Sequence, residues 1–155
     1  MKITVSEAVP DDIPAMREVE RHAVTAAHWN EEEYRRAFCG DRPRLVLALR
    51  QDDNLLAFLV GVRSGPEWEI ENVAVAADAR RRGLGTRLVG EFLDRVRQEG
   101  CEAVYLEVRE SNHAARHMYE KWAFTEAGRR KGYYSGPEED AIVYRCEFVN
   151  MIVSR

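Results

Sequence analysis

The 155-residue sequence lacks the features that mark secreted, membrane-bound or nucleic-acid-binding proteins. Its apolar runs are too short to span a bilayer, and residues 1–5 lack the apolar core of a signal peptide. The formal net charge is −4, so the composition gives no reason to expect nucleic-acid binding. We therefore expect a cytoplasmic protein that contacts neither a membrane nor nucleic acid directly.

Cysteine is also scarce. Cys39, Cys101 and Cys146 are far apart and in no metal-ligand spacing, which predicts reduced, buried thiols without chemistry. Hydrophobic residues make up 45% of the chain and charged residues 32%, a balance that excludes a disordered protein. No linker or repeat divides the sequence, so we expect a single domain over residues 1–155.

The most informative stretch is Arg80-Arg81-Arg82-Gly83-Leu84-Gly85-Thr86, which follows the apolar run Val73-Ala74-Val75 and opens a helical pattern. Two glycines one residue apart let backbone N–H groups approach a ligand. The start of a helix adds unpaired N–H donors and the positive end of its dipole. The arginines add forked donors for phosphate oxygens. The stretch predicts an anion site; a glycine-eased helix start after a solvated basic turn is the alternative.

Two common phosphate motifs are excluded at this loop. No Gly-Lys-Ser/Thr follows it, as a Walker loop requires. The third glycine and the later acidic residue of a dinucleotide fingerprint are also missing. The anion hypothesis is therefore a phosphate-bearing ligand other than a nucleoside triphosphate or NAD.

Apolar periodicity predicts a mixed α/β sheet flanked by helices. Helices are expected over residues 13–23, 30–38, 84–96 and 112–122, and strands over 3–5, 44–50, 55–63, 68–76, 103–108, 125–134 and 141–148. An aspartate should cap the first helix, whose apolar stripe has one polar interruption, Glu20, and Ser111 should cap the last. Three antiparallel strands precede the loop, and the strand, helix and strand around it predict a parallel pair.

With its elements in this order, the chain resembles the GNAT acyltransferase superfamily, whose diagnostic segment is a strand, an Arg/Gln-x-x-Gly-x-Gly/Ala loop and a helix. Residues 80–85 match that loop, with Arg80 where the family usually has glutamine. Within the superfamily, the chain is most similar to protein N-terminal acetyltransferases of the ribosomal-protein-alanine (RimI) type. The matching residues are those at 106–112, 115, 118–120, 133–134 and 139–141. The resemblance implies a GNAT fold, with a mostly antiparallel sheet and a central parallel strand pair.

The resemblance also implies acetyl-CoA as co-substrate. The residues expected to bind its pyrophosphate through their backbone are Arg81, Arg82, Gly83, Leu84, Gly85 and Thr86. The pantetheine arm is expected along Val73, Ala74 and Val75, with Asn112 as a further contact. Without the family, the run from Val73 to Val75 is a plain core strand, and Asn112 is a helix-start residue that binds backbone.

Glu107 matches the family's general base, and Tyr119 matches the general acid that protonates the departing CoA thiolate. An α-amino group has a pKa of about 7.7–8.0, against about 10.4 for lysine, so a carboxylate suffices to deprotonate it. Without the family, Glu107 is a solvated strand residue. Tyr119 is then a core aromatic residue on the helix stripe that it shares with Ala115, Met118 and Trp122.

Two further groups of residues have a functional and a plain interpretation. Tyr133 and Tyr134, with the acidic turn at residues 138–140, are expected to line the acceptor side and attract a basic peptide; a solvated turn is the alternative. His113 and His117 lie four residues apart on a helix, but no third ligand accompanies them. We therefore expect surface histidines and no metal.

The resemblance implies transfer of an acetyl group from acetyl-CoA to the α-amine of a protein, with alanine-starting ribosomal protein eighteen of the small subunit as the acceptor. The enzyme is expected to act as a monomer or weak dimer. Two alternatives stay open. The acceptor can be a lysine side chain, a polyamine or an aminoglycoside, or the chain can be a module that holds CoA without catalysis.

Overall fold

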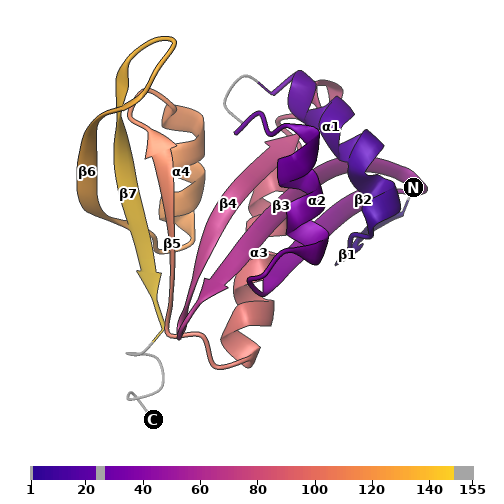
Figure 1. Cartoon of the computed structure of the whole chain (residues 1–155), viewed down its shortest axis with the longest axis horizontal. Coiled ribbons are helices and arrows are strands. Elements are labelled where there is room, and N and C mark those ends of the chain that lie inside the picture. Colours follow the sequence, from indigo (N-terminus) through magenta and orange to yellow (C-terminus); the bar gives the residue numbers. More distant parts are fainter. Residues whose placement is uncertain (1, 24–26, 149–155) are drawn as a thin grey trace.

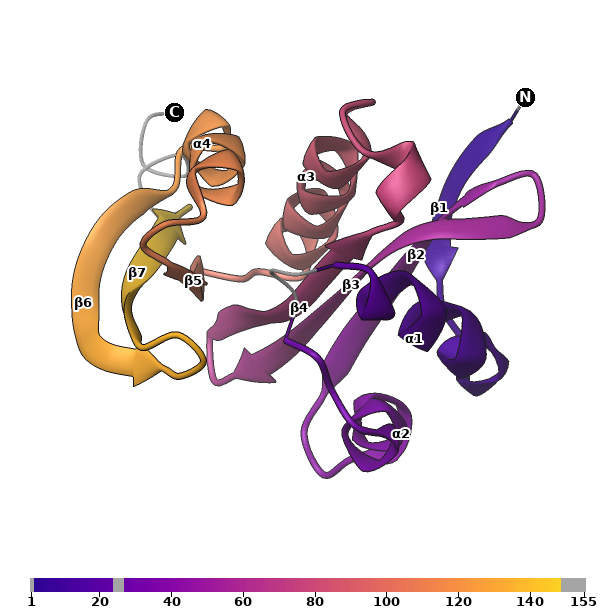
Figure 2. The same cartoon turned by 90° about the horizontal axis from the view of Figure 1, so that it is seen from above.

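The computed structural model describes residues 2–23 and 27–148. Over these ranges the chain forms a seven-stranded sheet with helices on both faces (Figure 1, Figure 2). The helices are η1 (Pro10–Asp12), α1 (Ile13–Arg21), α2 (Glu31–Cys39), η2 (Ala77–Ala79), α3 (Leu84–Gln98) and α4 (His113–Lys121). The strands are β1 (Ile3–Glu7), β2 (Arg44–Gln51), β3 (Asn54–Ser64), β4 (Glu67–Val75), β5 (Ala103–Arg109), β6 (Thr125–Tyr134) and β7 (Glu139–Glu147).

The strand order is β1-β2-β3-β4-β5-β7-β6. Neighbouring strands are antiparallel except β4 and β5, which are parallel. The predicted mixed sheet with one central parallel pair is therefore confirmed. The first strand adds a fourth antiparallel strand to the predicted meander, and β7 lies between β5 and β6.

Two apolar clusters hold the helices on the sheet. On one face, α3 buries Leu88, Val89 and Phe92 among the larger cluster. Gly61 of β3 makes room for this helix, because a Cβ there would lie 2.3 Å from the Phe92 ring. On the other face, α1 and α2 bury their apolar stripes against β2, β3 and β4. Figure 2 shows α1 and α2 on the face of the sheet opposite α3.

A β-bulge in the pairing of β3 with β4 reverses the face of the sheet to which alternate β4 side chains point. Gly61 pairs with Ile70 but Val60 pairs with Asn72, so one residue of β4 is extra. As a result Ile70 packs in the cluster under α3, whereas Ala74 packs in the cluster under α1 and α2. Asn72 shares the side of Ala74 because side chains two apart share a face.

Three local predictions need correction. Ser111 does not cap α4; the neighbouring Asn112 does, because its Oδ1 accepts from Ala115 N at 3.1 Å. Asp12 stands at the N-cap of α1, but its side chain accepts from Val9 N and Arg50 instead of from the helix. Cys39 is exposed, since it ends α2 at the surface, whereas Cys101 and Cys146 are buried as predicted.

The irregular stretch predicted over residues 22–29 includes residues 24–26, which lie outside the described residues. Among the helices that the structure describes, none has the length and apolar character to cross a membrane.

Candidate active site

The parallel strands β4 and β5 pair over three residues and then diverge. Glu67, Trp68 and Glu69 pair with residues 103–105, and from there the strands separate toward their C-terminal ends (Figure 1). Over the described residues, the run from Val73 to Val75 therefore has no strand partner on its β5 side. Such an edge offers N–H and C=O groups to an extended ligand, and ligands of open α/β sheets bind where parallel strands end and part.

The loop after β4 presents backbone donors at the start of α3. Arg81 and Gly83 both have positive φ, +65° and +75°, a pairing that turns successive N–H groups outward. No side chain caps α3, and its first backbone bond runs from Arg87 N to Gly83 O. The N–H groups of Leu84, Gly85 and Thr86 thus have no acceptor within the helix. This arrangement fits an anion at the predicted position.

Side chains contribute less to this loop than the sequence suggested. Arg80 Nη2 donates to His22 O at 2.7 Å, and Arg82 Nη2 donates to Gln51 Oε1 at 2.8 Å. Leu84 is buried in the core, so only its backbone faces a ligand. The Arg81 side chain is exposed and has no hydrogen bond or ion pair with any described residue, hence it is the arginine of this loop best placed for phosphate oxygens.

Glu107 lies on the face of β5 opposite Leu106 and Val108, which pack under α3. It therefore points to the side of α1 and α2, and its side chain is 15% exposed. Arg130 Nε lies 2.6 Å from Glu107 Oε2, close enough for an ion pair, while Oε2 has no aligned hydrogen-bond donor among the described residues. The Arg130 side chain is 60% exposed and its guanidinium lies 5.3 Å from the Tyr133 ring.

Tyr134 lies near Glu107, and Tyr119 lies near Tyr134. Burial raises the pKa of Tyr134 to about 12, with the charge of Glu107 as the second cause. Burial likewise raises the pKa of Tyr119, with Tyr134 as the second cause. Both phenols therefore keep their protons at neutral pH. The Tyr119 ring packs edge-on against Phe124, and its hydroxyl has no hydrogen-bond partner among the described residues, so it is free to donate.

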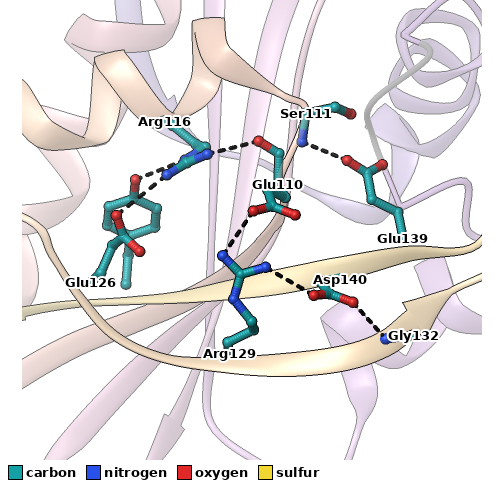
Figure 3. Close-up of polar contacts among 9 residues, drawn as sticks. Glu110, Ser111, Arg116, Glu126, Arg129, Gly132, Glu139 and Asp140 are labelled. Carbon is teal, nitrogen blue, oxygen red and sulfur yellow. Dashed lines mark hydrogen bonds and ion pairs between the residues drawn. The ribbon is translucent and has the colours of Figure 1, made fainter.

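The hairpin of β6 and β7 is held by ion pairs and hydrogen bonds (Figure 3). Arg129 bridges Glu110 at 2.7 Å and Asp140 at 2.8 Å, and Asp140 also accepts from Gly132 N at 2.9 Å. Glu139 accepts from Ser111 N at 2.5 Å. Two carboxylates of the acidic turn are thus used inside the protein, which leaves less charge for a basic peptide than the sequence suggested.

Asn112 caps the start of α4, because its Oδ1 accepts from the helix backbone. Only its side-chain NH₂ group is left for a ligand. His113 and His117 are exposed as predicted. No group of three His, Cys, Asp or Glu residues within the described ranges has the geometry of a metal site.

Comparison with known proteins identifies the fold family. The model of the acetyltransferase (GNAT) family matches residues 13–124. The chain belongs to this family. A [ribosomal protein bS18]-alanine N-acetyltransferase from Salmonella typhimurium is 36% identical over 144 residues, which cover 90% of this chain and 94% of that one. The crystal structure of the ribosomal-protein-S18-alanine N-acetyltransferase from Escherichia coli superposes with a TM-score of 0.87 at 33% identity over 94% of each chain.

A more distant structure has the same fold. Arabidopsis thaliana NAA60 in complex with acetyl-CoA superposes with a TM-score of 0.82 at 18% identity, over 96% of this chain and 99% of that chain. The resemblance drawn from the sequence is thus confirmed, and this GNAT protein is an acetyl-CoA-dependent N-acetyltransferase. The open edge of β4 and the uncapped start of α3 fit the extended arm and the pyrophosphate of that co-substrate.

The sequence analysis did not identify two charged residues that lie near Glu107. Arg130 gave no signal, since nothing in a strand of exposed residues marks the partner of Glu107. Glu69 did give one, because it alternates with Trp68 and Ile70 as Glu107 alternates with its apolar neighbours. Burial, followed by the charges of Glu71 and Glu107, raises the pKa of Glu69.

Proposed function

We propose that this enzyme acetylates the N-terminal α-amine of a protein, with Glu107 as general base and Tyr119 as general acid. The observation that supports the proposal is the position of Glu107 on β5 just beyond the point where β4 and β5 diverge, with Tyr134 near it and Tyr119 near Tyr134. The cofactor roles of Val73, Ala74, Val75, residues 81–86 and Asn112 belong to the same proposal. All of these residues lie in one chain, so a monomer suffices.

Glu107 takes one proton from the incoming α-ammonium group, which leaves a neutral amine to attack the thioester carbonyl; the second proton leaves the nitrogen for solvent as the amide bond forms. An α-ammonium group that approaches Glu107 replaces the cation already there, because Arg130 is paired with the carboxylate and largely exposed. Exchange of one cation for another avoids leaving a sheltered carboxylate without a partner. The pKa of an α-amine, about 7.7–8.0, makes this proton far easier to remove than that of lysine at about 10.4.

Tyr119 supplies a proton to the departing sulfur and regains one from solvent. Acetyl-CoA provides the acetyl group as a thioester, and its sulfur leaves with the bonding electron pair. The Tyr119 hydroxyl, kept protonated by burial and without another hydrogen-bond partner among the described residues, donates to that sulfur. Tyr133 and Tyr134 form the wall on the acceptor side, where their rings meet edge to face at 5.1 Å.

The acceptor that we propose is ribosomal protein bS18 with an N-terminal alanine. The relatives that cover nearly all of this chain at 34–36% identity are named for that substrate. We test it with purified enzyme, acetyl-CoA and peptides that share one bS18-derived sequence but begin with Ala, Ser, Glu or Lys. We expect the alanine peptide to be acetylated with the highest kcat/KM, and mass spectrometry to place the acetyl group on its α-nitrogen.

The same assay decides the two alternatives. A matched peptide with a blocked N-terminus and a free lysine, together with spermidine and an aminoglycoside, tests other acceptors. Preferential acetylation of these would overturn the proposal in favour of a side-chain or small-molecule enzyme. Tight acetyl-CoA binding without turnover on any amine would favour the non-catalytic module.

A further inference from the structure

Glu20 of α1 is a buried carboxylate that the proposed chemistry does not use. Its residue is 3% exposed, yet each of its oxygens accepts two hydrogen bonds. Oε2 accepts from His28 N at 2.6 Å and from Asn72 Nδ2 at 2.9 Å. Oε1 accepts from Trp29 N at 3.0 Å and from the Tyr34 hydroxyl. A carboxylate has about four acceptor sites, so every one is matched by a donor.

Asn72 extends these contacts to β4. The residue is 4% exposed, and its Oδ1 accepts from Ala27 N at 3.3 Å while its Nδ2 donates to Glu20. The bulge before Asn72 is what turns its side chain toward α1. Three consecutive backbone N–H groups, at residues 27–29, are therefore held by two buried side chains, one from α1 and one from β4.

Asn72 directly precedes Val73, the first residue of the edge proposed to bind the pantetheine arm. Residues 27–29 lie on the face of α1 and α2, the face to which Glu107 points. A second contact comes from the proposed cofactor loop, because Arg80 donates a hydrogen bond to His22 O at 2.7 Å, just after the end of α1. His22 and residues 27–29 are thus held by the strand and loop proposed to bind the cofactor as well as by α1.

From these contacts we propose that Glu20 is a positioning residue that sets the acceptor side of the site. It fixes residues 27–29 at a defined place beside the strand that holds acetyl-CoA, so that an acceptor peptide meets a preformed wall. Preorganised loops bind without a further ordering cost. The expected effect on catalysis rests on the proposed function. The hydrogen bonds from residues 27–29 to Glu20 and Asn72, here called the clamp, do not depend on it.

The test variant is Glu20→Gln, which keeps the shape of the side chain. It replaces one carboxylate oxygen, which accepts two hydrogen bonds, with an NH₂ group that accepts none. At least one of the N–H groups at residues 27–29 then loses its partner. We expect hydrogen exchange at these amides to accelerate at least tenfold. We also expect KM for the acceptor peptide to rise at least fivefold, while KM for acetyl-CoA changes less than twofold.

Two controls separate positioning from simple support of the fold. Tyr34→Phe removes a donor to the same carboxylate but keeps the ring that packs edge-on against Trp29 and every acceptor for the N–H groups of residues 27–29, so the acceptor KM should stay within twofold. Glu32→Gln makes the same chemical change at an exposed position of α2 and should change nothing. Should Glu20→Gln fail to fold, Asn72→Ala removes the acceptor for Ala27 N and serves in its place.

The outcomes are distinct. Unchanged amide exchange at residues 27–29 in both Glu20→Gln and Asn72→Ala would overturn the clamp. Faster exchange with equal changes in both KM values would overturn its role on the acceptor side. If the wild-type enzyme acetylated no N-terminal peptide, the proposed function would fail, whereas the exchange measurement would still report on the clamp.

Discussion

The proposed cofactor side and the proposed acceptor side of the active site are built differently. The cofactor side consists of backbone groups on β4 and at the start of α3, supported by apolar side chains such as Leu88 and Phe92. The acceptor side depends on charged and polar side chains from distant parts of the chain. Glu20 holds residues 27–29, and Arg109 pairs with Glu139 at 3.2 Å to fix the β6–β7 hairpin.

The cofactor side performs a task that GNAT enzymes share, the binding of acetyl-CoA. The acceptor side performs a task specific to this enzyme, the selection of its substrate. Backbone donors recognise a pyrophosphate whatever side chains accompany them, so the cofactor side needs only the right turn and a buried helix stripe. Buried hydrogen-bond networks specify one geometry and fail when a single member changes. The acceptor side is therefore where substitutions should alter selectivity, and the cofactor side is where they should alter affinity for acetyl-CoA.

The largest expected effect is at the boundary of the two sides. Glu107→Gln removes the proposed base but keeps its shape, so kcat for the alanine peptide should fall by about 10²–10⁴-fold. Binding of acetyl-CoA, measured by calorimetry, should stay within twofold of wild type. Glu102→Gln just before the same strand is the matched control and should retain full activity. A Glu107→Gln enzyme with more than a tenth of the wild-type kcat would remove Glu107 from the mechanism.

A smaller loss should follow from Tyr119→Phe, about 10–10²-fold in kcat, because a donor to the leaving sulfur is lost. Its thermal midpoint should stay unchanged, since the hydroxyl has no partner among the described residues. Tyr144→Phe should show the reverse. The Tyr144 hydroxyl accepts from Arg116 and donates to Glu120, so about 1–3 kcal/mol of stability should be lost with little change in kcat. Equal behaviour of the two variants would contradict the assigned acid.

On the cofactor side, Gly83→Ala tests the turn. A Cβ at Gly83 meets nothing within 4 Å, but its φ of +75° costs a non-glycine residue about 1–2 kcal/mol. Relief of that strain should move the loop and weaken acetyl-CoA binding about 5–10-fold. The acceptor KM at saturating acetyl-CoA should not change. Gly128→Ala, in open space with an ordinary φ, is the control; weakened binding there too would mean that the effect is not local.

The smallest effect is a pH dependence confined to the acceptor side. Hydrogen bonds from Ser111 to Glu139, and from Gly132 and Arg129 to Asp140, lower the pKa of both carboxyl groups below their ordinary values of 4.5 and 3.8. Because the folded pKa is lowered, the stabilisation is complete above those values and is lost as the pH falls through the folded pKa. The Gly132 amide resonance should therefore shift below pH 4, while amides of α3 stay unchanged. A shift above pH 5 would argue against this origin.

The cofactor side was predictable from the sequence because its signals are local. Gly83 and Gly85 stand three and five residues after Arg80, and the apolar stripe of α3 has helical period. The structure confirms the strand, loop and helix, and adds that Arg80 and Arg82 are tied to the protein. The choice between Ser111 and Asn112 as cap failed because both are good capping residues and stand side by side.

The acceptor side was harder because its contacts join residues far apart in sequence. Glu20 was visible as a polar interruption in an apolar stripe, but nothing local pointed to Asn72, which lies 52 positions later. The pairing of Glu107 with Arg130 depends on the placement of β7 between β5 and β6. Periodicity assigns a strand its faces but not its neighbours, so such partners appear only once the sheet is assembled.

The placement of β7 also constrains the order in which the parts of the site form during synthesis and folding. The strand that carries Glu107 pairs with β4 over three residues, but with β7 over seven, from Ala103 to Arg109. Residues 139–147 leave the ribosome after every other helix and strand that the structure describes. Non-local pairing of this kind forms slowly. A chain still being synthesised would accordingly form the proposed coenzyme-binding half before β7 fixes Glu107, the proposed base, and would gain activity only once β7 has paired.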